Sequence, residues 1–316
     1  MPDRRPRRAP AKPAAAVREL PAGPVRTSTG MAELIRDPDR PSAVTLYLDD
    51  AESSHVDLLD PTYLEFEYMQ QMLAVLDVLR PGPLRAVHLG GAACTFARAL
   101  DALRPGSSQL VVEIDAELAR LAREWFDLPR APRLRIRVGD ARAALGTLAP
   151  GAWDVLVRDA FNGPAVPAHL RTLEAAREAR AALVPGGLYL VNLTDRPPLR
   201  GAREEVATLR AVFEHVALVA DPAILRGRRF GNVVLACSSA PLPGPDLARV
   251  LRRLALPVRL VDGERLDDFV GTTPPLVDPA RPHDDEGPAP SGADPSSAVR
   301  LRADGRSRPA DPSGPG

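Results

Sequence analysis

A glycine pair and an acid mark a stretch of the chain that could bind a nucleoside. Gly90-Gly91 follows the apolar run 86–89, and Glu113 lies in the next apolar run, 110–114. Glycines let the backbone approach a ligand where a side chain would collide, and an acid at the end of the following strand can accept hydrogen bonds from two ribose hydroxyls. The loop reads GGAAC and offers no lysine for a phosphate. It therefore favours a nucleoside without a pyrophosphate, such as an S-adenosyl sulfonium compound, over NAD or ATP.

Two further acids stand at the ends of apolar runs and could act at the same place. Asp140 comes after the run 133–138, and Asp159 comes after the run 153–157. An aliphatic amine has a pKa of about 10, and a nearby carboxylate can take its proton while the nitrogen attacks a carbon bonded to a sulfonium. We therefore interpret Asp159 as a general base. The alternative for each acid is a structural cap of the following loop or helix.

Parallel strands that end at one edge of a sheet would bring these residues together. Five apolar runs alternate with helical spacing, at residues 86–89, 110–114, 133–138, 153–157 and 187–193. This alternation predicts an α/β fold with a doubly wound, Rossmann-like sheet, whose ligands bind beyond the carboxyl ends of the strands. Two later runs, 216–219 and 232–236, complete seven strands, the last antiparallel to its neighbours. Between them lies Arg-Gly-Arg-Arg (226–229), interpreted as a solvated hairpin tip, with an anion site as the alternative.

Composition divides the chain into four parts. Residues 1–30 are a basic tail rich in arginine and proline, for which we predict disorder and solvation rather than a nucleic-acid contact. Residues 31–60 contain short β runs around a DPDRP turn signal and predict a small β-hairpin region. A nucleoside-binding α/β domain is predicted over 61–255, and its first helix is expected to start near residue 62. Residues 256–316 form a C-terminal extension, predicted to be disordered from about 274.

Composition also limits partners and location. The 316 residues carry a formal net charge of zero and are 45% hydrophobic, so no global field attracts nucleic acid or a membrane surface. We see no run of the roughly eighteen apolar residues that a membrane span needs. Cys94 and Cys237 stand far apart, which favours free thiols in a reducing compartment and predicts a cytoplasmic protein. The histidines lack metal-ligand spacing, so no metal site is predicted, and His88 is interpreted as a core residue.

A set of motifs resembles the spermidine synthase family over roughly residues 31–240. The set consists of the predicted hairpin, Tyr63-Leu64-Glu65, VEID at 112–115, GDA at 139–141 and the strand-end Asp159. The resemblance implies the class I methyltransferase fold and transfer of an aminopropyl group from decarboxylated S-adenosylmethionine to an amine, usually putrescine, in polyamine biosynthesis. It implies a small-molecule amine as partner and no permanently bound cofactor. The hairpin region of family members associates, so a homodimer or larger homo-oligomer is expected.

The resemblance also assigns roles to individual residues. Those expected to contact the nucleoside are Gly90, Gly91, Glu113, Asp140 and Ala141. On the amine side, Asp159 is the expected catalytic base and Tyr63 its catalytic helper. The residues expected to contact the amine substrate are Glu65, Phe161 and Asn162.

Two positions depart from the family and keep three functions open. The family's glycine loop is close to GGGDG, and Ala93 stands where its Asp would bind the aminopropyl amine. The family's D-S-S-D loop reads DAFN here, so Asn162 replaces the second acid. Each charge-assisted hydrogen bond lost would cost about 1.5–3 kcal/mol. The alternatives are therefore an aminopropyltransferase, a methyltransferase that uses S-adenosylmethionine and needs no acid at position 93, and a non-catalytic member of the fold.

Overall fold

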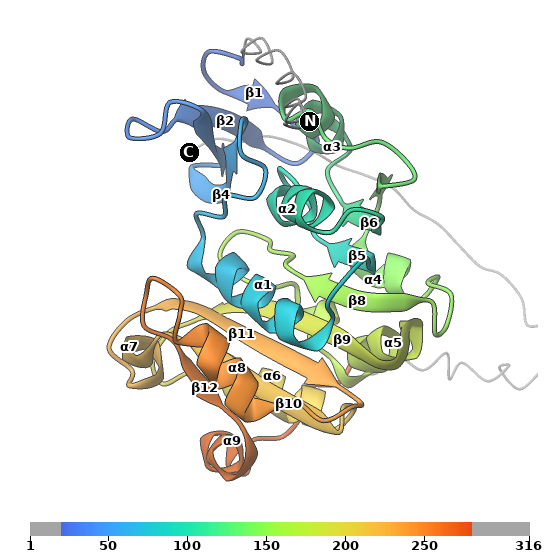
Figure 1. Ribbon diagram of the computed structural model, residues 1–316, viewed down its shortest axis with the longest axis vertical. Helices are drawn as coiled ribbons and strands as arrows, with labels where there is room; N and C mark the ends of the chain where they lie inside the picture. Colours follow the sequence, from blue (N-terminus) through green and yellow to red (C-terminus); the bar gives the residue numbers. More distant parts are fainter. Residues whose placement is uncertain (1–19, 280–316) are drawn as a thin grey trace, which may run out of the picture. The chain divides into compact units, whose positions relative to one another are not determined.

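The computed structural model describes residues 20–279, which form two β-sheets and their covering helices (Figure 1). Residues 1–19 and 280–316 lie outside this part, and with them most of the predicted tail and of the disorder predicted from about 274. The described residues up to Asp278 belong to one unit of the chain. The smaller sheet has the strand order β1-β2-β3-β4, and the larger sheet has the order β12-β10-β11-β9-β8-β5-β6-β7.

The larger sheet confirms the predicted doubly wound fold. Its parallel strands are β5 (Arg85–Leu89), β6 (Ser108–Glu113), β7 (Leu134–Val138), β8 (Trp153–Arg158) and β9 (Leu183–Asp195). β11 (Gly231–Ser238) is antiparallel to both of its neighbours, β9 and β10 (His215–Ala220). The prediction of seven strands misses an eighth, β12 (Arg259–Val261), within the predicted C-terminal extension. This strand pairs Leu260 with Val219 and so covers the otherwise open edge of β10.

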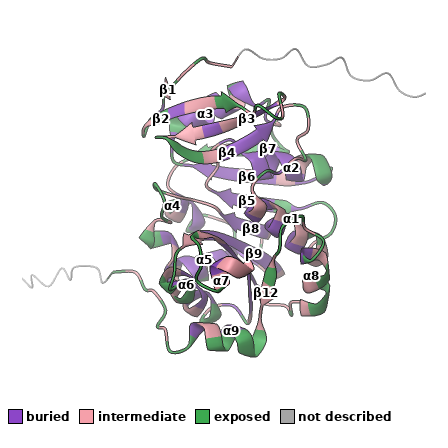
Figure 2. Cartoon of the chain, turned by 90° about the vertical axis from the view of Figure 1, so that its left-hand side faces the viewer, coloured by how far each residue is buried: buried purple, intermediate pink, exposed green. Residues whose placement is uncertain are grey.

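Helices cover both faces of this sheet. Those on one face are α1 (Glu67–Leu79), α2 (Thr95–Leu103) and α8 (Gly244–Leu251). Those on the other face are α4 (Ala141–Leu145), α5 (Leu173–Ala182), α6 (Arg200–Arg210) and α9 (Gly263–Val270). Strand β8 shows the alternation, since Val155 and Val157 pack on the first group and Leu156 packs on the second, and the strands are largely buried in Figure 2. Within residues 20–279 no helix combines the length and the apolarity required to cross a membrane.

The smaller sheet is antiparallel and larger than the predicted hairpin. Its strands are β1 (Val25–Arg26), β2 (Met31–Arg36), β3 (Ala43–Leu48) and β4 (Ala51–Asp57). Val44, Leu46 and Val56 form an apolar face that packs with residues of α2 and α3 (Ala116–Trp125). This packing explains how a sheet with so few strands is stabilised.

One carboxylate fixes the start of the smaller sheet to α3. Asp115 caps this helix by accepting a hydrogen bond from the amide of Leu118 at 2.7 Å. It also accepts from the amides of Ser28 and Thr29 at 3.0 and 2.8 Å, and from the Thr29 hydroxyl at 2.6 Å. Burial alone would raise the pKa of Asp115, but these hydrogen bonds hold its pKa well below the usual range. Ordered chain therefore begins before the boundary predicted at residue 30.

Two buried polar side chains of the core, His88 and Cys94, were not predicted to belong to the candidate site. Nε2 of His88 lies 2.9 Å from Oε1 of Gln109, whose amide donates to the carbonyl of Ala97. Burial lowers the pKa of His88 to about 4, which keeps the ring neutral and confirms it as a core residue. Cys94 is also buried, and burial raises the pKa of its thiol to about 12.

We expect Asp115→Asn to lower the free energy of unfolding by roughly 2 kcal/mol at neutral pH, because a buried charged acceptor is lost. A depressed pKa stabilises the fold above the unfolded value of about 4, and this stabilisation is lost as the pH falls toward the folded value. Urea unfolding should therefore show a difference in the free energy of unfolding between the variant and the parent protein at pH 7. This difference should be smaller near pH 3. Glu117→Gln, in the exposed first turn of α3, is the control and should change stability little. Equal stability of Asp115→Asn and the parent protein at pH 7 would contradict this role.

Candidate active site

The glycine loop after β5 lies against the end of β8. Gly90 adopts φ +94°, and a Cβ at this position would overlap the backbone carbonyl of Asp159. The amide of Asp159 donates to the carbonyl of Leu89 at 2.9 Å, so the two strand ends are joined where the loop begins. At Gly91 a Cβ would lie 2.6 Å from Cγ1 of Val111. The neighbouring strands therefore leave no room for a side chain at either glycine, even before a ligand is considered.

Glu113, at the end of β6, holds the glycine loop. Its Oε2 accepts hydrogen bonds from the amides of Gly91 and Ala92 at 3.0 and 2.8 Å. Its Oε1 accepts from the amide of Asp115 at 3.0 Å. Since each carboxylate oxygen can accept two hydrogen bonds, Oε1 keeps the capacity to accept one from a ligand hydroxyl.

Asp140 caps α4 and meets a histidine that the sequence did not single out. Its Oδ1 accepts from the amide of Ala143 at 2.9 Å, and its Oδ2 lies 3.0 Å from Nε2 of His169. Burial would raise the pKa of Asp140, but the bonds from Ala143 and His169 lower it below the usual value. Ala141, the first residue of α4, is buried beside this carboxylate. The capping interpretation of Asp140 is confirmed, and it leaves Oδ2 at the protein surface.

Asp159 is held between α1 and β9 by two hydrogen bonds. Its Oδ2 accepts from the hydroxyl of Tyr68 at 2.8 Å, and its Oδ1 accepts from Nδ2 of Asn192 at 2.9 Å. Burial raises the pKa of Asp159 above the usual value, although Asn192, Tyr68 and the neighbouring Arg158 act in the opposite direction. Oδ1 of Asn192 is buried and has no partner among residues 20–279. An oriented carboxylate with a raised pKa is suited to removing a proton from a bound amine.

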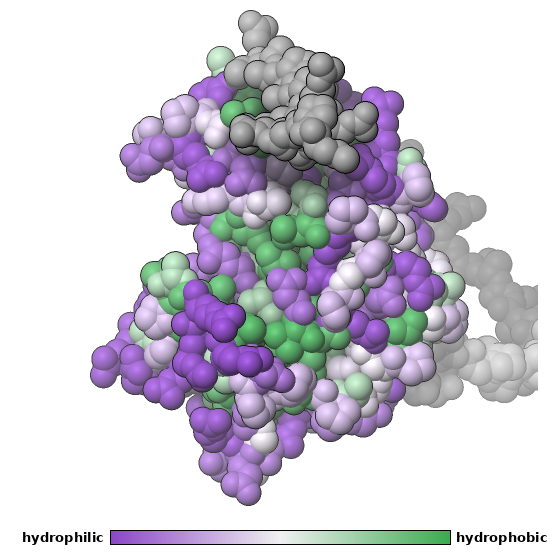
Figure 3. All heavy atoms as spheres, in the orientation of Figure 1, coloured by the Kyte–Doolittle hydropathy of each residue, from purple (hydrophilic) through white to green (hydrophobic). Residues whose placement is uncertain are grey.

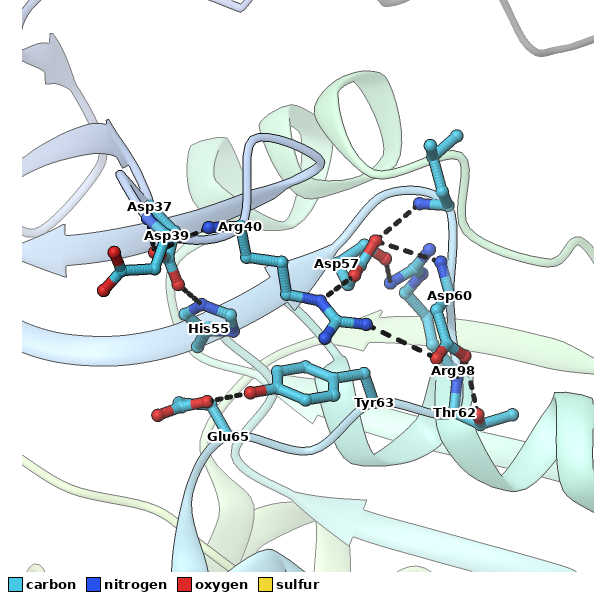
Figure 4. Close-up of polar contacts among 11 residues, drawn as sticks. Asp37, Asp39, Arg40, His55, Asp57, Asp60, Thr62, Tyr63, Glu65 and Arg98 are labelled. Carbon is cyan, nitrogen blue, oxygen red and sulfur yellow. Dashed lines mark hydrogen bonds and ion pairs between the residues drawn. The ribbon is translucent and has the colours of Figure 1, made fainter.

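The structure does not bring Tyr63 and Glu65 to Asp159 by any hydrogen bond between described residues. Instead the Tyr63 hydroxyl donates to Glu65, and the guanidinium of Arg40 lies 3.7 Å from the centre of the Tyr63 ring (Figure 4). The hydrogen bond to Glu65, followed by burial, raises the pKa of Tyr63. Arg40 also pairs with the buried Asp57, so this group joins the smaller sheet to the start of α1. The tyrosine that contacts Asp159 is Tyr68, and a catalytic role of Tyr63 stays a prediction.

The loop after Asp159 carries the other predicted substrate residues. Phe161 is half-buried and Asn162 is exposed. The amide of Asn162 donates to the carbonyl of Ala165 at 2.8 Å, which closes a tight turn. The hydroxyl of Thr194, near the end of β9, donates to the carbonyl of Pro164 at 2.8 Å. The loop is therefore hydrogen-bonded to β9, the strand that supplies Asn192. Within the described part, the side chains of Phe161 and Asn162 form no hydrogen bond with Asp159.

A buried ion pair anchors the far end of this loop. Arg158 and Glu205 are each 1% exposed and form a salt bridge on the sheet face opposite Tyr68. Arg158 also donates to the carbonyl of Leu170 at 2.9 Å, and Nε of Arg171 donates to the second oxygen of Glu205 at 2.8 Å. Burial would lower the pKa of Arg158, but the attraction to Glu205 raises it, so the guanidinium stays charged. The loop of residues 160–171 is thus fixed at both ends.

The candidate site is defined here by these converging side chains. A hollow of about 860 Å³ lies elsewhere, between the segment near Leu20 and α3, with Arg120, Arg123 and Trp125 in its lining. It includes none of the predicted site residues. Among the residues that the structure describes, no three His, Cys, Asp or Glu side chains gather as a metal ion would require.

We expect Tyr68→Phe to raise the pKa of Asp159 further, because the variant removes a hydrogen bond that favours the ionised carboxylate. Tyr63→Phe is the matched control and should leave this pKa unchanged, since the Tyr63 hydroxyl is bonded to Glu65. Carboxyl-carbon NMR of aspartate-labelled protein measures both titrations. If the pKa of Asp159 shifts in Tyr63→Phe and does not shift in Tyr68→Phe, the roles assigned to the two tyrosines are reversed.

Proteins of known or assigned activity resemble this chain, although no family model matches it. A polyamine aminopropyltransferase of Vibrio vulnificus is 32% identical over 150 residues, which cover 47% of this chain and 49% of the relative. An N-terminal histidine N-methyltransferase of Emericella nidulans is 28% identical over 178 residues, or 52% of this chain and 32% of the relative. The chain thus spans about half the length of two curated polyamine aminopropyltransferases that it matches, those of Vibrio vulnificus and Chromobacterium violaceum.

A solved structure matches over a much larger share of both chains. The probable spermidine synthase of Corynebacterium glutamicum is 37% identical, with a TM-score of 0.78. The match covers 84% of this chain and 99% of the other. Because so high an identity extends over nearly the whole of that protein, the chain belongs to the spermidine synthase family.

Proposed function

We propose that the protein is an aminopropyltransferase that uses decarboxylated S-adenosylmethionine and a small amine, in polyamine biosynthesis. The observation that carries the proposal is Asp159, held by Tyr68 and Asn192 beside the glycine loop. A base at this edge of the sheet can reach an amine that approaches a nucleoside lying over Gly90. The family membership of the chain supports the same reaction.

The proposed reaction combines one substitution with one proton transfer. The amine nitrogen attacks the aminopropyl carbon that is bonded to the sulfonium. The carbon–sulfur bond breaks and its electron pair stays on sulfur, which gives methylthioadenosine as the leaving group. The proton of the attacking amine passes to Asp159 and from there to solvent. The raised pKa of Asp159 makes it a stronger base than an exposed aspartate, and the positively charged sulfur needs no acid to leave.

We propose that Glu113 and Asp140 bind the adenosine part of the co-substrate. The free acceptor capacity of Glu113 Oε1 suits a ribose hydroxyl. Asp140 Oδ2 suits the adenine amino group, which would share or displace the contact with His169. Gly90, Gly91 and Ala141 would contribute backbone close to the nucleoside, and no permanently bound cofactor is part of the proposal.

A methyltransferase that uses S-adenosylmethionine is the second candidate, and one observation favours it. Ala93 is fully buried in the glycine loop, so this position offers no charge to the ammonium of an aminopropyl group. A transferred methyl group needs no such partner. The methyltransferase among the relatives named above supports this alternative, and a non-catalytic member of the fold would bind neither co-substrate.

We further propose that the protein acts in the cytoplasm and associates through its smaller sheet. Cys94 and Cys237 are both free, as expected in a reducing compartment. Met31 and Ile35 of β2 are apolar and 39% and 48% exposed. Exposed apolar side chains on a strand favour a homodimer or larger homo-oligomer.

Calorimetric titration of the full chain separates the candidate functions. We expect decarboxylated S-adenosylmethionine to bind roughly tenfold more tightly than S-adenosylmethionine, because the extra carboxylate would lie near Asp159. Glu113→Gln should weaken methylthioadenosine binding by about 1–3 kcal/mol, and the control Glu117→Gln should not. Tighter binding of S-adenosylmethionine would favour the methyltransferase, and binding of neither compound would favour a non-catalytic protein.

A second experiment tests the base and the amine site. Asp159→Asn should lower kcat about 10²–10⁴-fold and leave methylthioadenosine affinity nearly intact. Asp154→Asn is the control, since Asp154 lies at the other end of β8 and accepts from the amide of Arg85. Asn162→Asp should improve the KM for a dicationic diamine, because it adds a carboxylate to the substrate loop. Full activity of Asp159→Asn would place the base elsewhere and remove the main support for aminopropyl transfer.

A further inference from the structure

A short segment after α9 is bound to the helices on one face of the larger sheet. We call residues 274–278 the C-terminal strap; they leave α9 and pass beside α6 and α5 (Figure 2). The amide of Leu276 donates to the hydroxyl of Thr208 in α6 at 2.9 Å. The carbonyl of Leu276 accepts from the amide of Leu173, the first residue of α5, also at 2.9 Å. Because the first amides of a helix have no acceptor within the helix, the strap supplies one that α5 lacks.

Asp278 joins the strap to two elements of the candidate site. Its Oδ1 accepts a hydrogen bond from the hydroxyl of Thr172 at 2.6 Å, and its Oδ2 lies 3.1 Å from a terminal nitrogen of Arg142. Thr172 caps α5 and directly follows the loop of residues 160–171. Arg142 is the second residue of α4. One carboxylate thus connects α4 with the end of the loop that begins after the candidate base.

These contacts close a ring that includes the proposed adenosine contact. Asp140 caps α4 and lies 3.0 Å from the ring of His169, which stands in the loop three residues before Thr172. The ring therefore runs from Asp278 to Arg142, along α4 to Asp140, across to His169, and through Thr172 back to Asp278. A helix of five residues is too short to be stable on its own, so the place of α4 and of its cap depends on such contacts.

Hydrogen bonds and an ion pair, more than burial, hold the strap in place. Leu276 is half-buried and Val277 is 59% exposed, while the amide of Asp278 donates to Glu174 at 2.9 Å. Hydrophilic surface also gathers around α9, from which the strap departs (Figure 3). Segments with few buried apolar contacts open at a small cost in free energy, without unfolding of the core. Loss of the Asp278 side chain is therefore expected to release the strap locally.

We propose that Asp278 is a positioning residue of the nucleoside site, and that the C-terminal strap fixes Asp140 through α4 and the loop. This inference rests on the proposed binding of a nucleoside co-substrate and adds to it a control from outside the site. Asp159 is held by Tyr68 and Asn192, which the strap does not contact through any hydrogen bond between described residues. The strap therefore acts on the binding of the nucleoside and leaves the proton transfer unchanged.

Calorimetric titration of the full chain with methylthioadenosine tests the inference. Asp278→Ala should weaken the affinity roughly fivefold, because Arg142 and Thr172 both lose their acceptor. Asp278→Asn keeps an acceptor for Thr172 and loses the charge that faces Arg142, so its effect should be smaller. In an assay of the proposed transfer, Asp278→Ala should raise the KM for the nucleoside co-substrate and leave kcat nearly unchanged.

The control variant is Asp267→Ala, which also removes an ion pair of the C-terminal extension. Asp267 lies in α9 and pairs with Arg210 of α6, away from α4 and the loop. This variant should bind methylthioadenosine as the parent protein does. Urea unfolding should give nearly the same free energy for both variants and the parent protein, because neither side chain belongs to the core.

Hydrogen exchange of the backbone amides follows the strap without any ligand. In Asp278→Ala, the amides of α4, of the loop and of Leu173 should exchange several-fold faster than in the parent protein. The amides of β5 and β8 should exchange as before, since the strap does not contact the middle of the sheet by any hydrogen bond among the described residues. Asp267→Ala should leave the amides of α4 and of the loop unchanged.

Unchanged affinity of Asp278→Ala for methylthioadenosine overturns the inference, even if Leu173 exchanges faster, because the strap would then only cap α5. An equal loss of affinity in Asp267→Ala also overturns it. If the parent protein binds no methylthioadenosine, the proposed function fails, and the exchange measurement alone decides about the strap. Faster exchange that reaches α4 then supports the positioning of Asp140, and a change confined to α5 contradicts it.

Discussion

The contact between the glycine loop and the end of β8 is the constraint on which the site depends. Gly90 lies so close to the carbonyl of Asp159 that the loop can pass only without a side chain. This approach brings the loop that would carry the nucleoside beside the carboxylate that would receive the amine proton. The distance between the two functions of the site is therefore set by backbone packing between β5 and β8, before any ligand binds. Reacting groups that are held in position in this way avoid much of the entropy cost of bringing them together.

The acids at this edge of the sheet hold the protein together as well as offering charge to a ligand. Glu113 closes the glycine loop, Asp140 caps α4, and Asp115 caps α3 while it orders the start of the smaller sheet. Each has oxygens committed to backbone amides, which fixes the direction of the oxygens that remain. A functional and a structural interpretation of such an acid are consequently compatible. An individual carboxylate oxygen can serve a ligand only if it can still accept a hydrogen bond after its bonds to the protein are counted.

The parallel strands of the sheet could be predicted from the sequence because buried parallel strands are apolar runs, here followed by glycine or an acid. The partners of Asp159 could not be predicted in the same way. Tyr68 lies in the first turn of α1, which begins at Glu67, whereas Tyr63 precedes the helix, and the expected helix start near residue 62 hid this difference. His169 and Asn192 lie 29 and 33 residues from the acids that they contact, and nothing local in the chain marks such pairs. Strand β12 was missed because three residues carry too little pattern to stand out from a polar extension.

Alternation along one strand explains how a base and a fixed cation can be adjacent in sequence without neutralising one another. Arg158 is the last residue of β8 and Asp159 follows it, and their side chains point to opposite faces of the sheet, so Arg158 is buried against Glu205 and Asp159 faces Tyr68. Because Glu205 neutralises the guanidinium, burial remains the dominant influence on Asp159, and its pKa is raised rather than lowered. Without Glu205, the buried guanidinium of Arg158 would have no counter-charge. Its positive charge would then lower the pKa of Asp159 and make Asp159 a weaker proton acceptor. The ion pair thus does more than anchor the loop at Arg171: it helps to keep the pKa of the carboxylate on the other face of the sheet raised, which the proposed proton transfer would require.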